Sequence, residues 1–259
     1  MSNNDSTEIT ISTPGTIIAF LFEISIPFIA LFIWVNFFKG KTKPFFIGMA
    51  GFICSIILEN IFLYLINLIF KSIIIIFYII AGICPGLFEE TGRFICLRFF
   101  LTKEKDKKVS ISYGIGHGGL ESILTGINVI STLILKDILI KNGSLKQSIP
   151  FYLNMVSAYE RLFAVILHIS LSVIVYKSVI EKKIYFYIFA IIIHDFVDLF
   201  ALLYQLKVIK SIFVVELILT ILSVSSAIFS YKLYNNLKDD ENEDLINISG
   251  VDIVEETPK

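Results

Sequence analysis

Charged side chains are scarce in this chain of 259 residues, and the few that are present nearly cancel. Asp, Glu, Lys and Arg make up 17% of the residues, and the formal net charge is −1. Soluble domains usually carry about a quarter of their residues as charged side chains. A nearly neutral chain also lacks the basic surface that binds nucleic acid. We therefore expect neither an ordinary soluble domain nor a nucleic-acid partner.

Cysteine is rare as well, and basic residues are missing from the N-terminal segment. The spacing of Cys54, Cys84 and Cys96 fits neither a zinc knuckle nor a secreted disulfide framework. Residues 1–15 contain no Lys or Arg, whereas a cleaved signal peptide begins with a basic stretch. We expect the cysteines to act as small apolar residues and the first apolar stretch to be retained as a membrane helix.

Apolar residues, in contrast, are abundant and lie in long runs. They make up 56% of the chain, and the mean hydropathy is +0.80. A run of roughly 20 apolar residues is long enough to cross a bilayer as a helix. The sequence therefore predicts an all-α fold, a polytopic membrane helical bundle of about seven transmembrane helices. The segments lie near residues 16–38, 45–70, 72–101, 110–135, 152–176, 184–206 and 211–233.

The chain divides into a polar N-terminal segment at 1–15, a transmembrane helical domain at 16–237 and an acidic flexible tail at 238–259. With the N-terminus outside, most Lys and Arg residues of the connecting segments fall on the cytoplasmic side, as is usual in membrane proteins. We expect a multi-pass protein of the cell membrane with an external N-terminus and a cytoplasmic C-terminus. Within the long third segment, Pro85-Gly86 is expected to introduce a bend.

Many ionisable side chains lie inside the apolar segments, where charge is costly and is functional by default. All three histidines of the chain are among them. Helix positions three or four apart share a face, and this spacing pairs His117 with Glu121 and His194 with Asp198. We expect these groups to line one shared polar chamber and to find partners on their own helices. The set comprises Glu89, Glu90, Arg93, His117, Glu121, Glu160, Arg161, His168, His194, Asp195 and Asp198.

Such a chamber suits the activation of water for hydrolysis of a peptide bond. A carboxylate beside a histidine can take a proton from water. A second histidine, with an Asp or Asn, can donate hydrogen bonds to the oxyanion of a tetrahedral intermediate. An arginine near the two glutamates would hold one of them ionised. The groups therefore predict an endopeptidase that works within the membrane.

Four short motifs in these segments resemble those of the glutamic-type intramembrane proteases, specifically the YhfC-like family. That family is related to the type II CAAX prenyl endopeptidases, the bacterial CAAX-protease and bacteriocin-processing family, and the PrsW-type proteases. The resemblance covers about residues 80–200 and does not identify a substrate. We expect the substrate of such a membrane endopeptidase to be a membrane-embedded or membrane-associated peptide. The motifs are "EETGR" at 89–93, "GHGGLES" at 116–122, "YERLFAVILHIS" at 159–170 and "HDFVD" at 194–198.

The resemblance implies a role for each group. Glu89 or Glu90 would be the general base, and His117 would help to orient the water. His194 and Asp198 would stabilise the oxyanion. The supporting residues would be Arg93, Glu121, Glu160, Arg161 and His168.

Two departures from the related CAAX-type pattern leave alternatives open. PrsW-like members place a glutamate in the second motif, so Glu121 is an alternative to His117 as the partner of the base. CAAX-type members often have Asn where this chain has Asp198. An ionised Asp cannot donate a hydrogen bond, so Asp198 is either protonated or acts by orienting His194.

No metal cofactor is expected, because the chain lacks the His-Glu-x-x-His helix of zinc membrane proteases. Zinc stays the alternative, since three histidines and several carboxylates could converge on it. Two other functions also stay open: a transporter or proton-coupled carrier, and a non-catalytic immunity or scaffold protein with the protease fold. Glu23, Glu59 and Glu216, each alone in its segment, are interpreted as packing or channel-lining groups.

Overall fold

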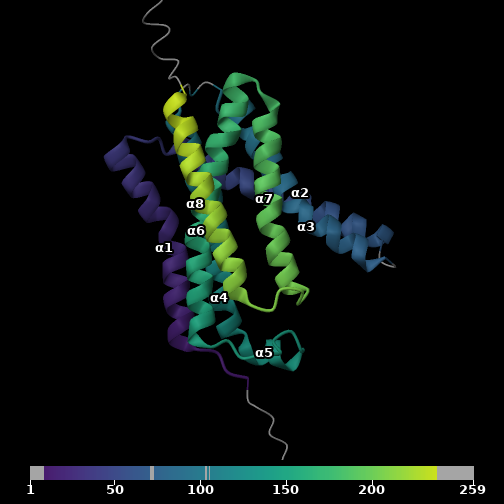
Figure 1. The fold of residues 1–259 in the computed structure, drawn as a ribbon. Helices are drawn as coiled ribbons and strands as arrows, with labels where there is room; N and C mark the ends of the chain where they lie inside the picture. Colours follow the sequence, from purple (N-terminus) through teal and green to yellow (C-terminus); the bar gives the residue numbers. More distant parts are fainter. Residues whose placement is uncertain (1–8, 71–72, 103, 105, 238–259) are drawn as a thin grey trace, which may run out of the picture.

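The computed structural model describes residues 9–70, 73–102, 104 and 106–237 (Figure 1). The expected acidic tail at 238–259 and the first eight residues of the expected N-terminal segment lie outside these ranges. Within them the chain is almost entirely helical, and a single bridge between extended residues joins Ile11 to Ile149. This bridge ties the start of the first helix to the segment that precedes α6.

Seven long helices and two shorter pieces follow one another along the described part of the chain. Each predicted apolar segment corresponds to one long helix, which confirms the all-α membrane bundle. The elements are α1 (Thr13–Phe38), α2 (Lys43–Phe70), α3 (Ile74–Ile95), the π-helical turn η1 (Cys96–Phe100), α4 (Lys108–Ile134), the short α5 (Lys136–Lys141), α6 (Phe151–Glu181), α7 (Ile184–Gln205) and α8 (Ile212–Asn236).

Five helices of the described chain are long and apolar enough to cross a membrane by length and composition: α1, α2, α6, α7 and α8. Helix α4 is not among them, because its middle holds "GHGGLES" in place of large apolar residues. The expected count of seven spans is therefore approximate. The glycines and polar groups that lower the hydropathy of α4 are the ones that build the site described below.

Helix α6 is the centre of the bundle. It packs against α1, α4, α7 and α8 and also touches α3, and it is the most buried of the five apolar helices. Figure 1 shows α2 and α3 paired with each other and projecting sideways from the remaining helices. The inner ends of this pair meet α4 and α7, so motifs from α3, α4, α6 and α7 come together at one level of the bundle.

Glycine allows α2 and α4 to approach closely. Gly48 of α2 lies against the backbone carbonyl of Tyr113, and Gly116 of α4 lies against the backbone of Phe45. A methyl group at either position would overlap backbone atoms. Small residues at helix crossings permit such close contact between membrane helices. The glycine-rich motif therefore allows a close helix contact, and α4 stays a continuous helix through it.

Helix α3 is continuous through Pro85 and Gly86, and the bend predicted there stays a prediction. A π-helical turn lies further along, at Cys96–Phe100. Gly86 has a packing role, because a methyl group there would overlap the carboxylate of Asp195 on α7. Close packing at Gly86 brings the next turn of α3, which carries Glu89 and Glu90, against α7.

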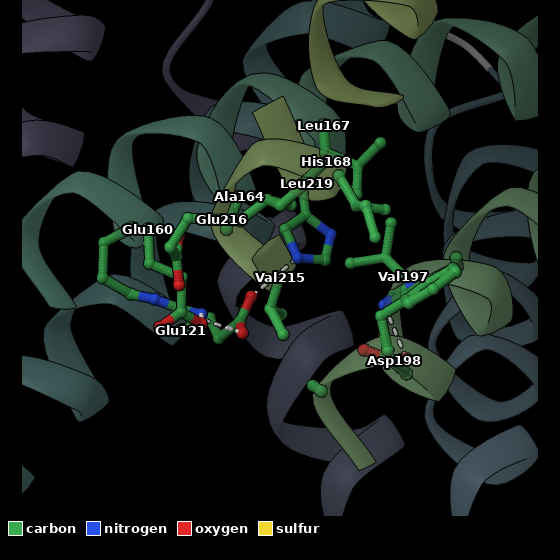
Figure 2. Close-up of a pocket in the computed structure, with 15 residues that line it drawn as sticks. Glu121, Glu160, Ala164, Leu167, His168, Val197, Asp198, Val215, Glu216 and Leu219 are labelled. Atoms are coloured by element: carbon green, nitrogen blue, oxygen red, sulfur yellow. Dashed lines mark hydrogen bonds and ion pairs between the residues drawn. The ribbon is translucent and has the colours of Figure 1, made fainter. Parts of the chain in front are cut away.

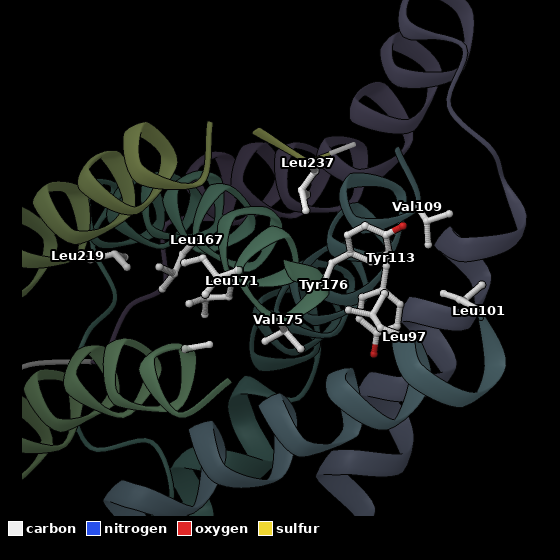
Figure 3. Packing of buried hydrophobic residues seen from close by; sticks show 12 residues of the cluster. Leu97, Leu101, Val109, Tyr113, Leu167, Leu171, Val175, Tyr176, Leu219 and Leu237 are labelled. Carbon is white, nitrogen blue, oxygen red and sulfur yellow. The ribbon is translucent and has the colours of Figure 1, made fainter. Parts of the chain in front are cut away.

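A cluster of buried apolar side chains holds the helices in register. Figure 3 shows it extending from Leu167 and Leu219 at one end to Leu97, Leu101 and Val109 at the other. The lipid around a membrane bundle is as apolar as the core of the bundle, so exclusion of water does not drive helices together there. Close van der Waals packing specifies these contacts instead. The polar site occupies the space beside this cluster.

Candidate active site

The two adjacent glutamates of α3 have different partners. Glu89 Oε2 lies 2.9 Å from His117 Nε2 of α4 and 3.9 Å from His194 Nε2 of α7. Both oxygens of Glu90 accept from Arg93 Nη1 at 2.5 Å, and Glu90 Oε1 lies 2.8 Å from His194 Nδ1. Successive helix residues point about 100° apart. One glutamate is therefore paired with arginine, while the other faces two histidines.

Arg93 extends this pairing to α6. Its Nη2 lies 3.0 Å from His168 Nδ1, and His168 Nε2 lies 2.6 Å from Glu121 Oε2 of α4. A guanidinium group can only donate, so His168 Nδ1 accepts. The proton of a neutral His168 is then on Nε2, which donates to Glu121. This hydrogen-bond pattern assigns the tautomer of His168.

The chain of hydrogen-bonded acidic and basic groups continues towards the surface through Arg161. Arg161 Nη1 donates to Glu121 Oε1 at 2.5 Å, and Nη2 donates to Glu160. Exposure rises along this chain, because the side chain of Glu160 is 38% exposed whereas Glu90 and Arg93 are completely buried. Each carboxylate of this hydrogen-bonded chain is bonded to a guanidinium group, and the opposite charge offsets the cost of removing the carboxylate from water.

His194 of α7 is held at one nitrogen and open at the other. Its Nδ1 donates to the carboxylate of Glu90. Its Nε2 lies 3.9 Å from Glu89 Oε2 and 3.6 Å from Asp198 Oδ2. Both distances exceed ordinary hydrogen bonds. The open Nε2 therefore points to a space between two carboxylates.

His117 of α4 has the reverse arrangement. Its Nε2 contacts Glu89, and its Nδ1 is buried without a hydrogen-bond partner among the described residues. The ring packs against those of Phe52 and His168, with centroids 5.1 Å away in each case. Close packing holds the ring in place, so the one polar contact of His117 is directed to Glu89.

A cavity of about 70 Å³ adjoins these groups between α4, α6, α7 and α8. It has space for water. Figure 2 shows Glu121 and Glu160 on one side of the cavity, Asp198 on the other and His168 between them. Glu89 does not line the cavity itself but lies behind His194, which does. The polar lining residues are Glu121, Glu160, Arg161, His168, His194, Asp198 and Glu216.

The structure thus brings all of the predicted catalytic and supporting residues into one region, but with partners that differ from the expected ones. The prediction that each polar group pairs within its own helix is wrong for His117 and Glu121. His117 pairs with Glu89 of α3, and Glu121 pairs with two residues of α6. Residues of one helix stripe all point into the bundle, where polar groups of neighbouring helices lie nearer to them than the next residue of the same stripe. Asp195, also expected in the chamber, lies instead against Gly86.

Glu216 of α8 lines the cavity but is not among the predicted site residues. It is 6% exposed, and its Oε2 has no hydrogen-bond partner among the described residues. No motif surrounds it, and the sequence leaves it as a packing or channel-lining group. A signal was nevertheless present, since Glu216 is the only charged residue between Lys210 and Lys232. A lone carboxylate in a membrane helix is functional by default.

The donor atoms around Glu89 satisfy the chemistry of a metal site. One ligand atom each from Glu89, His168 and His194 lies within 4.8 Å of the others. Two imidazoles and a carboxylate are the protein ligands of several catalytic zinc sites. Metal-binding histidines usually hold their second nitrogen against a carboxylate or carbonyl, as His194 does with Glu90.

Two of these three groups are ready to bind a metal and the third is engaged. Glu89 Oε2 and His194 Nε2 face each other across 3.9 Å. His168 has Arg93 at one nitrogen and Glu121 at the other. His168 would have to exchange one of these contacts to become a ligand. The residues present therefore fit zinc, with Glu89 and His194 as its first ligands.

The helical bundle and its buried cluster of acids, imidazoles and guanidinium groups define a polytopic membrane protein with a polar site enclosed by its helices. Residues 22–219 match the family model described as YhfC intramembrane metalloprotease. The chain is also 30% identical over 242 residues to the uncharacterized membrane protein YhfC of Bacillus subtilis (strain 168), covering 83% of this chain and 92% of the relative. No solved structure matches the chain.

The chain therefore belongs to the YhfC intramembrane metalloprotease family, which confirms the resemblance seen in its motifs. The matched region begins within α1, ends within α8 and includes every residue of the site. The description of the family names a metalloprotease, so the expectation of a metal-free, glutamic-type mechanism is not confirmed.

Proposed function

We propose that this protein is an endopeptidase that hydrolyses a peptide bond of a membrane-embedded or membrane-associated substrate at Glu89, His117 and His194. One observation carries the proposal. The carboxylate of Glu89 is buried in the bundle, is not bonded to arginine and faces two histidines, one of which lines the cavity. These features suit a base that takes a proton from water, whereas a structural ion pair would need none of them.

The neighbours of Glu89 have separate tasks in this proposal. Glu89 takes a proton from the attacking water and later transfers it to the leaving amine. His117 holds the carboxylate in position. A protonated His194 donates from Nε2 to the oxyanion, while its Nδ1 stays bonded to Glu90. In this arrangement an ionised Asp198, whose Oδ2 lies 3.6 Å from Nε2, favours the protonated form of His194 by its charge and does not need to donate a hydrogen bond.

Zinc binding is compatible with the same residues. A bound zinc ion would be held by Glu89 and His194, with His168 as the third ligand, and would polarise the scissile carbonyl or the attacking water. With Glu89 engaged in this way, Asp198 is the remaining carboxylate beside His194 and would accept the proton. Arg93 and Glu90 keep the same role in both cases, because they orient His194.

The proposal is tested with purified protein in liposomes and a pool of synthetic transmembrane peptides, with products identified by mass spectrometry. Glu89→Gln keeps the shape of the side chain and removes the base, so cleavage should fall by at least about 100-fold. The matched control is Glu23→Gln, another buried carboxylate of a membrane helix, which lies outside the cavity lining. Undiminished cleavage by Glu89→Gln would overturn the proposal.

Metal content is measured on the same preparations without reference to activity. A metal site predicts about one zinc ion per chain in the wild type and loss of that zinc in both Glu89→Gln and His194→Ala. The metal-free version predicts no stoichiometric zinc and cleavage that survives a strong chelator. These two results distinguish the zinc-dependent mechanism from the metal-free mechanism. The endopeptidase activity itself is tested separately, by the cleavage assay.

A further inference from the structure

Two carboxylates of the cavity have an oxygen that accepts no hydrogen bond from the described chain, although Asp198 Oδ2 lies 3.6 Å from His194 Nε2. Glu216 Oε2 and Asp198 Oδ2 are buried and have no hydrogen-bond partner among the described residues. Glu216 is more than nine-tenths buried. Leaving a buried carboxylate oxygen unpaired is unfavourable. A cationic group that enters the cavity would therefore gain strong, charge-assisted hydrogen bonds.

The cavity has no free cation of its own to meet these oxygens. Arg161 is the one arginine or lysine in the lining, and its guanidinium is already bonded to Glu121 and Glu160. The histidines His168 and His194 are turned to Glu121 and Glu90. Within the described part of the chain, the cavity lining therefore offers Glu216 no arginine or lysine that is not already bonded to another carboxylate.

The rest of the lining is apolar and close to Glu216. Figure 2 shows Val215, Leu219, Ala164 and Leu167 grouped around Glu216 and His168. Lysine and arginine place an apolar stem before a charged end, and they pack the stem on apolar surface. A metal ion, in contrast, is bound by N, O and S donor atoms and gains nothing from apolar side chains. The one group of side chains that could hold a metal among the described residues does not include Glu216.

We propose that this cavity is a specificity subsite for a basic side chain of the peptide substrate, with Glu216 and Asp198 binding its ammonium or guanidinium end. The inference rests on the proposed function, because His194 belongs both to the cavity lining and to the Glu89 site. Since one residue joins the two, the basic side chain lies close to the bond that is cleaved. Glu216 is then a specificity-determining residue and not a packing group.

The test uses the reconstituted protein and matched transmembrane peptides that differ at one position near the cleaved bond. That position carries Lys, Arg, norleucine or Glu, and every peptide has an acetylated N-terminus so that only the side chain supplies charge. In the wild type, the Lys and Arg peptides should be cleaved about tenfold faster than the norleucine peptide, the effect of one charged hydrogen bond.

The variants separate charge recognition from folding. Glu216→Gln should reduce the preference for Lys over norleucine to within about twofold, while cleavage of the norleucine peptide stays at its wild-type rate. Glu23→Gln, on α1, should keep the full preference. Glu216→Lys should reverse the order and favour the Glu peptide. Retained preference for Lys in Glu216→Gln overturns the inference, as does equal cleavage of Lys and norleucine peptides by the wild type.

Binding supplies a readout that does not depend on turnover. A photo-crosslinking Lys peptide should label the inactive Glu89→Gln protein, and excess Lys peptide should compete about tenfold better than the norleucine peptide. Cleavage without charge preference contradicts the subsite and leaves the proposed function intact. Selective crosslinking of the Lys peptide by a wild type that cleaves no peptide supports the subsite and contradicts the proposed function.

Discussion

Arg93 determines how the two glutamates of α3 differ. It is completely buried, donates to both oxygens of Glu90 and reaches His168 with its other terminal nitrogen. A guanidinium group suits this place because its planar fork serves two partners at once. With Glu90 held in this way, Glu89 is the glutamate left to face His117. The sequence alone left the choice between Glu89 and Glu90 open.

Removal of Arg93 should destabilise the protein far more than removal of the whole pair. Arg93→Met leaves Glu90 buried without its cation, which costs about 3–5 kcal/mol. The double variant Arg93→Met, Glu90→Leu removes both charges and should recover most of that loss. Both effects are measured by unfolding the purified variants in detergent and monitoring the loss of helix by circular dichroism. A single variant as stable as the wild type would contradict the assigned role of the pair.

At the scale of elements, the site depends on how closely α4 approaches its neighbours. Gly116 lies against the backbone of Phe45, and the adjacent His117 is the residue that contacts Glu89. On the opposite side of α4, Gly114 lies against the backbone of Ile169 in α6. The glycines thus bring α4 between α2 and α6 at the level of the polar residues. The same glycines lower the hydropathy of α4.

A glycine substitution in α4 should separate close packing from helix propensity. Gly116→Ala overlaps the carbonyl of Phe45, so we expect a loss of about 1–3 kcal/mol and reduced cleavage, because His117 shifts with the backbone. Gly126→Ala is the control in the same helix, since its new methyl group would meet side-chain atoms of Glu23 and Ile24 at 3.3 Å. It should be nearly neutral. Thermal unfolding and the peptide assay compare the two variants, and equal losses would contradict the packing argument.

At the scale of the whole molecule, connecting segments join the ends of the helices. Lys41 and Lys43, before and at the start of α2, reach Glu104 between η1 and α4, with Nζ to carboxylate distances of 2.7 and 3.2 Å. The two ammonium groups hold the pKa of Glu104 below its ordinary value of about 4.5. A carboxyl group whose pKa is lowered by folding stabilises the folded state above the unfolded-state pKa. This contribution is lost as the pH falls through the lower, folded-state pKa.

The Glu104 contact therefore predicts a small stability difference that depends on pH. Near neutral pH, Glu104→Gln should be less stable than the wild type by no more than about 1 kcal/mol, because the pair lies at the surface. The difference should shrink as the pH falls below the unfolded-state pKa and vanish once the pH is below the lowered folded-state pKa, where Glu104 is protonated in both states. Thermal unfolding from pH 7 to pH 3 measures it. A difference that grows as the pH falls would have the wrong sign.

Orientation in the membrane is a second prediction for the whole molecule. The distribution of Lys and Arg predicts an external N-terminus and a cytoplasmic C-terminus. The segment around Glu104 would then be cytoplasmic, and the connection between α4 and α6 external. Single cysteines placed at Lys41 and Lys146 in a variant without the native cysteines test this. An impermeant thiol reagent applied to intact cells should label only position 146, and labelling of position 41 alone would reverse the assignment.

The sequence by itself determined the membrane class, the helical segments and which ionisable residues gather. Long apolar runs form helices in lipid because every backbone group must be hydrogen-bonded there. Charges within such runs must face one another or a cavity. The pair Glu89 and Glu90, together with His117 and His194, could therefore be selected from the sequence alone. Their motif context also agrees with the family to which the chain belongs.

Only the tertiary structure decided the partner of each group. Whether Glu89 or Glu90 meets Arg93, and whether Glu121 meets His117 or His168, depends on the rotation and crossing of helices. These are set by contacts between segments distant in sequence, such as Gly116 with Phe45. Glu216 joined the cavity for the same reason, because α8 packs on α6 with that face inward. Spacing along one helix carries no information about which neighbouring helix its residues meet.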